Sequence, residues 1–225
     1  MLKKYKLGIL LILIVCPIFV FLFLQFFGRN QYKLPIYYPV DVKYKDTNGR
    51  KVADTVYHTI PAFSLTDQQG NTFDSKQLGG KIYVVDFFFT RCGNPDFCPR
   101  MSNELKRVQE IFKDNPKVKI LSISVDPTFD QPDILQRYAQ KYKANPGQWF
   151  FLTGDKTAIY KLAFEGFKVN AGEETDTVNP DFFHALNFIL IDAQGRVRGY
   201  YEGINKEAVD KLILEMNILL TENTN

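Results

Sequence analysis

The chain has few of the side chains that build metal clusters or a disulfide framework. Its 225 residues include three cysteines, two histidines and one tryptophan. Structural zinc sites take four ligands from Cys and His, and disulfide-dense scaffolds use many more cysteines. The low count argues against both classes. Two thiols in one metal site would need a third ligand of another kind.

The chain also has no excess charge beyond its first residues. The formal net charge is +3, and Lys3, Lys4 and Lys6 account for it, since removing them leaves as many basic residues as the 25 acidic ones. A neutral domain without a basic stripe argues against nucleic-acid binding. Internal repeats and low-complexity segments are absent as well, which excludes repeat architectures.

Long apolar runs are absent except for one, residues 7–27, LGILLILIVCPIFVFLFLQFF. A helix of this length crosses a hydrocarbon core of about 30 Å. A cleaved signal peptide has a shorter apolar region followed by a small-residue cleavage site. No such site is visible, so we expect a retained membrane anchor. Cys16 lies inside this run and is interpreted as inert.

The charges around this run predict its orientation. Three lysines precede it and no acidic residue comes before Asp41, so the positive-inside rule predicts a cytoplasmic N-terminus. The start of the chain lacks the Arg- and Ser-rich composition of a mitochondrial presequence. We expect a single-pass protein of the bacterial inner membrane, with its soluble part on the periplasmic or another extracytoplasmic side. The predicted organisation is a cytoplasmic tip and anchor at 1–27, a linker at 28–40 and one domain at 41–225.

Beyond residue 40 the pattern changes from hairpins to alternating strands and helices. Asn48-Gly49 and the segment DQQGN at 67–71 are turn signals that predict two early hairpins. The continuous apolar run at 81–90 predicts a strand buried on both faces. The element order predicts an α/β fold, a central mixed sheet flanked by helices. The remaining predicted elements are a helix over 99–115, strands over 117–126 and 148–154, helices starting near Pro132 and Asp155, a polar loop over 170–183, a hairpin over 185–203 and a helix over 206–220.

Two cysteines lie where the first buried strand meets a helix. Cys92 ends the strand, and Cys98 precedes Pro99, a residue suited to the first helical position, so Cys98 is predicted at the N-cap. The helix dipole there lowers a thiol pKa and favours the thiolate that attacks disulfides or binds metals. Five residues separate the thiols, enough for a disulfide or for an ion between them. A bridge over so short a loop stabilises a fold modestly, which favours a reactive pair or metal ligands over a structural disulfide.

Several ionisable residues bear on these thiols. His184 precedes a strand that can lie beside the first one, which would place it near the cysteine loop. His58 has no evident partner and is interpreted as a packing or surface residue. Asp86 interrupts the buried strand, where a charge is costly. It is either paired internally or turned to the strand end, or it is a buried acid that exchanges protons with the thiols. Asp126 and Asp130 are interpreted as structural, the first at a strand end and the second as a helix cap.

Several motifs follow one another in a recognisable order: PAFSLTDQQGN, FFFTRC, the second cysteine before Pro99, SISVDPTFDQP, WFFLTG and FFHALNFILIDAQGRVRGYYEG. They resemble the Sco/SenC family, membrane-tethered, thioredoxin-fold copper chaperones for cytochrome c oxidase. The resemblance covers roughly residues 60–219. It implies a thioredoxin-like fold and a copper site made by Cys92, Cys98 and His184, for Cu(I) and, with an added oxygen ligand, Cu(II).

The chain departs from the family pattern at the cysteines. The family usually places three residues between them, and this chain has five. The longer loop either leaves copper binding intact or favours thiol redox chemistry. Asp86, six residues before Cys92, matches a thioredoxin pattern and favours the redox function. The absence of a Trp-Cys-x-x-Cys motif, and of a proline immediately before the strand that follows His184, argues against a general thioredoxin role.

Three functions remain open from the sequence. The first is a copper chaperone that delivers copper to the copper-centre subunit of an oxidase or to another copper protein. The second is an extracytoplasmic thiol–disulfide oxidoreductase with Cys92 and Cys98 as the redox pair and Asp86 as proton acceptor. The third is a scaffold whose cysteines form a plain structural bridge. A peroxidase is disfavoured, because Thr90 stands only two positions before Cys92 with no proline upstream at the spacing a peroxidatic site needs.

Overall fold

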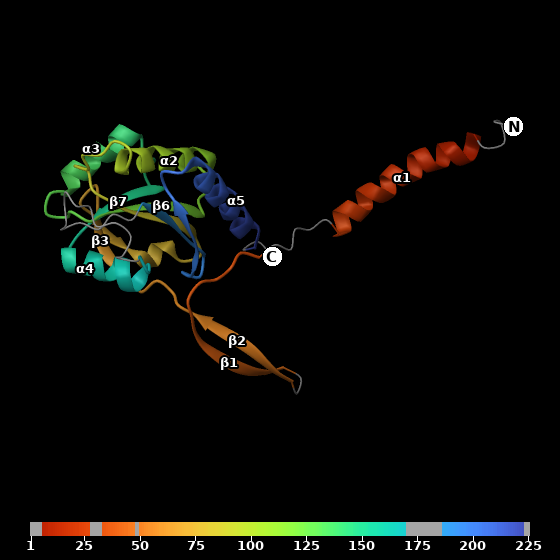
Figure 1. The fold of residues 1–225 in the computed structure, drawn as a ribbon, viewed down its shortest axis with the longest axis horizontal. Helices are drawn as coiled ribbons and strands as arrows, with labels where there is room; N and C mark the ends of the chain where they lie inside the picture. Colours follow the sequence, from red (N-terminus) through yellow and green to blue (C-terminus); the bar gives the residue numbers. More distant parts are fainter. Residues whose placement is uncertain (1–5, 28–32, 48–49, 170–185, 223–225) are drawn as a thin grey trace. The chain divides into compact units, whose positions relative to one another are not determined.

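The computed structural model describes residues 6–27, 33–47, 50–169 and 186–222, and the chain forms two units, Met1–Lys33 and Leu34–Asn225 (Figure 1). The first unit contains one helix, α1 (Lys6–Phe27), with Pro17 inside it. Among the described residues, none of the helices combines the length and hydropathy that crossing a bilayer requires.

The second unit is built around a seven-stranded mixed sheet with the strand order β4-β3-β7-β6-β5-β8-β9. Helices α2, α3 and α5 cover one face, and α4 lies on the other (Figure 1). The strands are β3 (Ser64–Asp67), β4 (Thr72–Asp74), β5 (Ile82–Phe88), β6 (Val118–Ser124), β7 (Trp149–Thr153), β8 (Asn187–Ile191) and β9 (Val197–Glu202). The helices are α2 (Cys98–Ile111), α3 (Pro132–Tyr142), α4 (Lys156–Lys161) and α5 (Lys206–Glu222), with a 3-10 turn at Ser75–Leu78 and a π turn at Leu162–Gly166. The predicted α/β class is confirmed.

Strand β5 lies at the centre of the core, as its apolar run predicts. All seven of its residues are buried. It pairs in parallel with β6, Val84 opposite Ile120, and antiparallel with β8, Val84 opposite Leu190. Since β8 runs against β5, the start of β8 lies at the same sheet edge as the end of β5. Cys92 follows β5 at this edge. The prediction that the strand after His184 lies beside the strand before Cys92 is therefore confirmed.

Two helix starts test the capping predictions. Helix α4 starts near Asp155, as predicted, and the Asp155 carboxylate caps it by accepting from the Ala158 N–H at 2.8 Å. The predicted cap of α3 by Asp130 is wrong. Gln131 occupies the N-cap position without a side-chain cap bond, because the carboxylate of Asp130 is turned to the sheet edge and bonded there.

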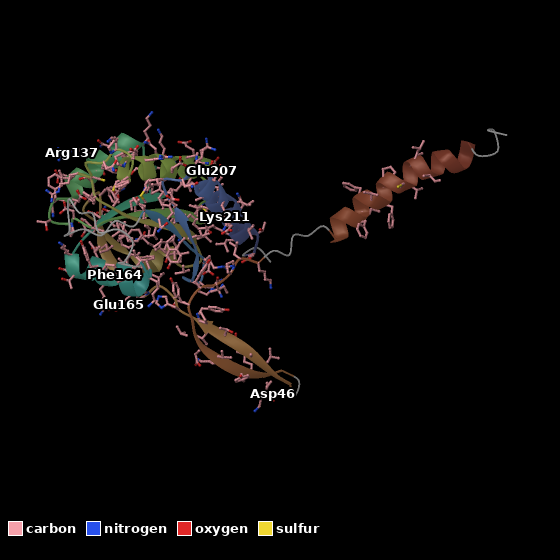
Figure 2. The ribbon with its side chains drawn as sticks, in the orientation of Figure 1. Asp46, Arg137, Phe164, Glu165, Glu207 and Lys211 are labelled. Carbon is pink, nitrogen blue, oxygen red and sulfur yellow. The ribbon has the colours of Figure 1, made fainter. Side chains whose placement is uncertain are left out.

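A separate two-stranded hairpin, β1 (Pro39–Thr47) with β2 (Arg50–Tyr57), extends from the globular part of this unit (Figure 1). Asp46 lies near its tip (Figure 2). Three of its apolar residues, Val40, Val42 and Tyr44, are exposed. Contacts at its base hold it: Tyr38 Oη lies 3.0 Å from Tyr200 Oη, and His58 Nε2 lies 2.8 Å from the Gly166 carbonyl oxygen. His58 is therefore a packing residue, as predicted.

The segment before this hairpin is fixed to the core by a buried arginine. Arg198 donates to the carbonyl oxygens of Leu34 and Pro35 at 2.8 and 2.9 Å. Its guanidinium also pairs with Asp192 and Glu222, both at 3.1 Å. One buried cation thus joins the entry of the domain to β9 and to the end of α5.

Candidate dithiol and metal site

The two cysteines lie at the edge of the sheet where β5 ends and α2 begins. Cys92 follows β5 in a loop, and Cys98 is the first residue of α2, with Phe97 at the N-cap position. The prediction that Cys98 is the N-cap is therefore wrong by one residue. Pro99 comes second in the helix, where its missing N–H costs no hydrogen bond.

The two thiols lie next to each other and are both unbridged. Cys92 and Cys98 are free cysteines, and the Cys92 side chain lies close enough to raise the pKa of the Cys98 thiol. Cys98 is buried, with 3% of its surface exposed, whereas Cys92 is only partly buried. The Cys92 thiol also lies 3.7 Å from the Asn94 carbonyl oxygen in the loop. Cys92 is therefore accessible from solvent and Cys98 is not, which is the arrangement of a reactive pair.

The structure corrects the expected acidity of Cys98. The hydrogen bond with Cys92, burial and repulsion from a Cys92 thiolate raise the pKa of the Cys98 thiol, while the Phe89 backbone N–H acts in the opposite direction. The helix terminus does not outweigh these effects, because the sulfur is desolvated and lies against a second sulfur. Cys98 therefore holds its proton more tightly than an exposed thiol does.

Asp86 lies in the middle of β5 with 1% of its surface exposed. It is therefore not turned to the strand end. Neither carboxylate oxygen has a hydrogen-bond partner among the described residues. Burial raises the pKa of Asp86 to about 7. The hydroxyl of Ser122, which is paired with Asp86 on β6, has the smaller, opposite effect of lowering this pKa. A negative charge on Asp86 also raises the pKa of Cys98, so the two groups are electrostatically connected.

The predicted third ligand lies outside the described residues. His184 belongs to 170–185, which the structure does not describe. The described residues contain no group of three or more metal-ligating side chains, so within them the candidate site consists of Cys92 and Cys98. Strand β8 begins three residues after His184, at the sheet edge that carries the cysteines.

The part of the site that sequence reasoning missed is a polar network beside Cys92. Asp126 and Asp130, interpreted as structural, contact the two residues that precede the cysteine. Arg91 Nε donates to Asp126 at 2.6 Å, and the Thr90 N–H donates to Asp130 at 3.1 Å. The carboxyl ends of parallel strands meet at one sheet edge. This rule alone could have predicted that Asp126 and Asp130 lie near Cys92. The sequence does not show which donors the carboxylates select.

Two neighbouring cysteines at the carboxyl edge of β5, on a mixed sheet covered by helices, are typical of a protein with a thioredoxin-like fold. The SCO1/SenC family model matches residues 52–216, and the chain belongs to this family. It is 30% identical over 172 residues to the SCO1 protein homolog of Bacillus subtilis (strain 168), across 75% of this chain and 86% of that protein.

Two solved structures of the family match the fold. One is BsSco, described as a member of the Sco family of cytochrome c oxidase assembly proteins with a disulfide switch. It is 28% identical with a TM-score of 0.63, over 73% of this chain and 94% of that one. The other is Bradyrhizobium japonicum ScoI with copper bound, 28% identical with a TM-score of 0.58, over 72% of this chain and 99% of that one. The thioredoxin-like fold implied by the sequence motifs is confirmed.

Proposed function

We propose that this protein is a membrane-anchored copper-binding chaperone that supports assembly of the copper centre of cytochrome c oxidase. Its copper ligands are Cys92, Cys98 and His184. The observation that carries the proposal is the pair of neighbouring, unbridged cysteines at the sheet edge where β8 begins. The family relationship and the copper-bound ScoI relative support it.

The donor set fits copper as a cargo. Thiolate sulfur and imidazole nitrogen suit Cu(I), and an added oxygen ligand would suit Cu(II). Metal binding to thiols releases their protons. Because the pKa of Cys98 is raised in the metal-free protein, copper loading would have to displace the proton of Cys98. Copper uptake is therefore expected to weaken as the pH falls.

The proposed location follows from the first residues. We assign residues 7–27 as a retained anchor of the bacterial inner membrane, with the three lysines inside and the domain on the periplasmic or equivalent side. The proposed partner is the copper-centre subunit of the oxidase or another copper protein. An accessible Cys92 beside a buried Cys98 suits transfer, because the partner's ligands can approach one sulfur first.

A Cu(I) competition titration tests the proposal. The full chain carries Cys16→Ser, so that Cys92 and Cys98 are its only thiols, and is compared with His184→Ala and His58→Ala variants. We expect one tight Cu(I) per chain, about 10- to 100-fold weaker binding in His184→Ala, and no change in His58→Ala. Binding that is weak and independent of His184 would contradict the proposed site.

A second function, a thiol–disulfide oxidoreductase, is supported by the same pair and by Asp86. Two adjacent thiols of unequal exposure can alternate between dithiol and disulfide, the accessible Cys92 attacking first. Asp86, with its pKa raised to about 7, would be the proton acceptor. Reduction of the disulfide in a client's copper site would serve copper delivery as well. If the Cys92→Ser/Cys98→Ser variant supports oxidase assembly as well as wild type, this function is excluded.

A further inference from the structure

A buried carboxylate holds the residue two positions before Cys92. Asp130 is fully buried, and it accepts three hydrogen bonds. The Thr90 N–H donates to Oδ2 at 3.1 Å, the Thr90 hydroxyl donates to Oδ1, and the Ser124 hydroxyl donates to Oδ2 at 2.5 Å. Both backbone and side chain of Thr90 are thereby fixed to the end of β6.

A second carboxylate holds the residue immediately before Cys92. Asp126 has 3% of its surface exposed and accepts from Arg91 Nε at 2.6 Å. The guanidinium carbon lies 4.8 Å from the centre of the Phe129 ring, which adds a cation–π contact to the ion pair. The Asp126 N–H donates to Ser124 Oγ at 3.1 Å. Ser124 thus connects the two carboxylates into one network.

The long loop between the thiols does little by itself to fix their separation. Its hydrogen bonds are local: the Phe97 N–H donates to the Asn94 carbonyl oxygen at 3.2 Å, and the Asp96 N–H donates to Asn94 Oδ1 at 2.9 Å. Helix α2 fixes Cys98 directly. A flexible loop of five residues does not fix the distance back to Cys92, since each added residue enlarges the set of end-to-end separations. Cys92 itself donates its N–H to the Phe89 carbonyl oxygen at 3.3 Å and packs against the core. The contacts of Thr90 and Arg91 add to these a direct connection between the residues before Cys92 and the segment after β6.

We propose that Asp126 and Asp130 are positioning residues that hold the sulfur of Cys92 beside that of Cys98 across the five-residue loop. They act through Arg91 and Thr90 and do not touch the thiols. The use of the paired sulfurs for copper rests on the proposed function. The pairing itself is measurable without copper, so the two ideas fail separately.

The test is a redox titration of the Cys92–Cys98 pair in the full chain with Cys16→Ser, against dithiothreitol and its oxidised form. Thr90→Val removes the hydroxyl donor and keeps the backbone N–H, Asp130→Asn removes one acceptor, and Thr90→Ser restores the hydroxyl. Loosened sulfurs have a lower effective concentration for each other. We expect the equilibrium constant for disulfide formation to fall about ten-fold, or about 30 mV, in Thr90→Val and Asp130→Asn, and to stay at the wild-type value in Thr90→Ser.

Asp192→Asn is the matched control. Asp192 has 1% of its surface exposed and accepts from the backbone N–H groups of Gln194 and Arg196, at the opposite sheet edge. It is expected to lower stability without changing the equilibrium constant. The proposal is overturned if Thr90→Val and Asp130→Asn keep the wild-type constant, or if Asp192→Asn lowers it equally. A shift in the expected variants with no Cu(I) binding by the wild type would leave the positioning role intact and contradict only the proposed function.

Discussion

At the scale of single residues, the buried carboxyl of Asp86 couples the fold to pH. Its pKa rises from 3.8 to about 7 because burial penalises its charge. The folded state therefore holds a proton that the unfolded state releases. The associated stability is fully present below the unfolded pKa and is lost as the pH rises through about 7. Over this window the free energy of unfolding is expected to fall by roughly 4 kcal/mol.

Asp86→Asn removes this titration. We expect the variant's free energy of unfolding, from urea melts between pH 4 and pH 8, to lack the decrease that wild type shows. The rate of thiol alkylation is expected to lose a pH-dependent step near 7 as well, since the charge of Asp86 acts on Cys98. Parallel stability curves for the two proteins would show that Asp86 does not titrate in this window.

The two thiols are expected to react at different rates. Cys92 is partly exposed, whereas Cys98 has 3% of its surface exposed and a raised pKa. Because the thiolate is the reactive form, iodoacetamide should modify Cys92 at least about ten-fold faster than Cys98. Peptide mass spectrometry after timed labelling of the reduced protein measures both rates. Equal rates would mean that the buried position of Cys98 does not persist in solution.

At the scale of elements, the contacts of Arg198 predict a large cost for its removal. Arg198→Met leaves the carbonyl oxygens of Leu34 and Pro35 without their described donor and removes one partner of Asp192, which keeps Arg196 at 2.8 Å. Breaking a buried ion pair costs about 3–5 kcal/mol. Urea unfolding of the second unit measures the loss.

Arg137→Met is the control for this prediction. Arg137 pairs with Asp133 at 3.0 Å on the exposed side of α3 (Figure 2), and both side chains are mostly solvent-accessible. Such a pair contributes about 0–1 kcal/mol. Similar losses in the two variants would mean that the segment at Leu34 is not held by Arg198.

The hairpin of β1 and β2 is expected to be dispensable for the fold. An isolated two-stranded sheet is marginally stable in water, and the described contacts with the globular part are made at its base by Tyr38 and His58. Replacing residues 42–54 by a short glycine-rich turn should change the free energy of unfolding by less than about 1 kcal/mol. It should leave Cu(I) affinity unchanged. A loss of several kcal/mol would show that the strands pack on the domain.

At the scale of the whole molecule, most of the architecture could be predicted from pattern alone. The apolar run of β5, the helix start near Asp155 and the order of strands and helices could all be read from patterns in the sequence. The neighbourhood of β5 and β8 followed from the mixed sheet. These features depend on periodicity and topology, which a single sequence contains.

The errors concern interactions between residues far apart in the chain. Asp130 has the composition of a helix cap, but Thr90 and Ser124 supply donors at the sheet edge. Cys98 lies near a helix terminus, which predicts a lowered pKa, but burial and Cys92 reverse the direction. Whether a carboxylate or thiol meets a donor, an apolar wall or a second sulfur is decided by packing. The role of His184 as a ligand stays a prediction, because it lies outside the described residues.

The most direct test of the copper site is X-ray absorption at the copper K-edge, on the Cu(I)-loaded chain with Cys16→Ser, with and without His184→Ala. We expect two sulfur ligands and one nitrogen ligand per copper in the first protein. In His184→Ala we expect loss of the imidazole scattering with both sulfurs retained. A site with sulfur ligands alone, or identical spectra for the two proteins, would rule out His184 as a copper ligand.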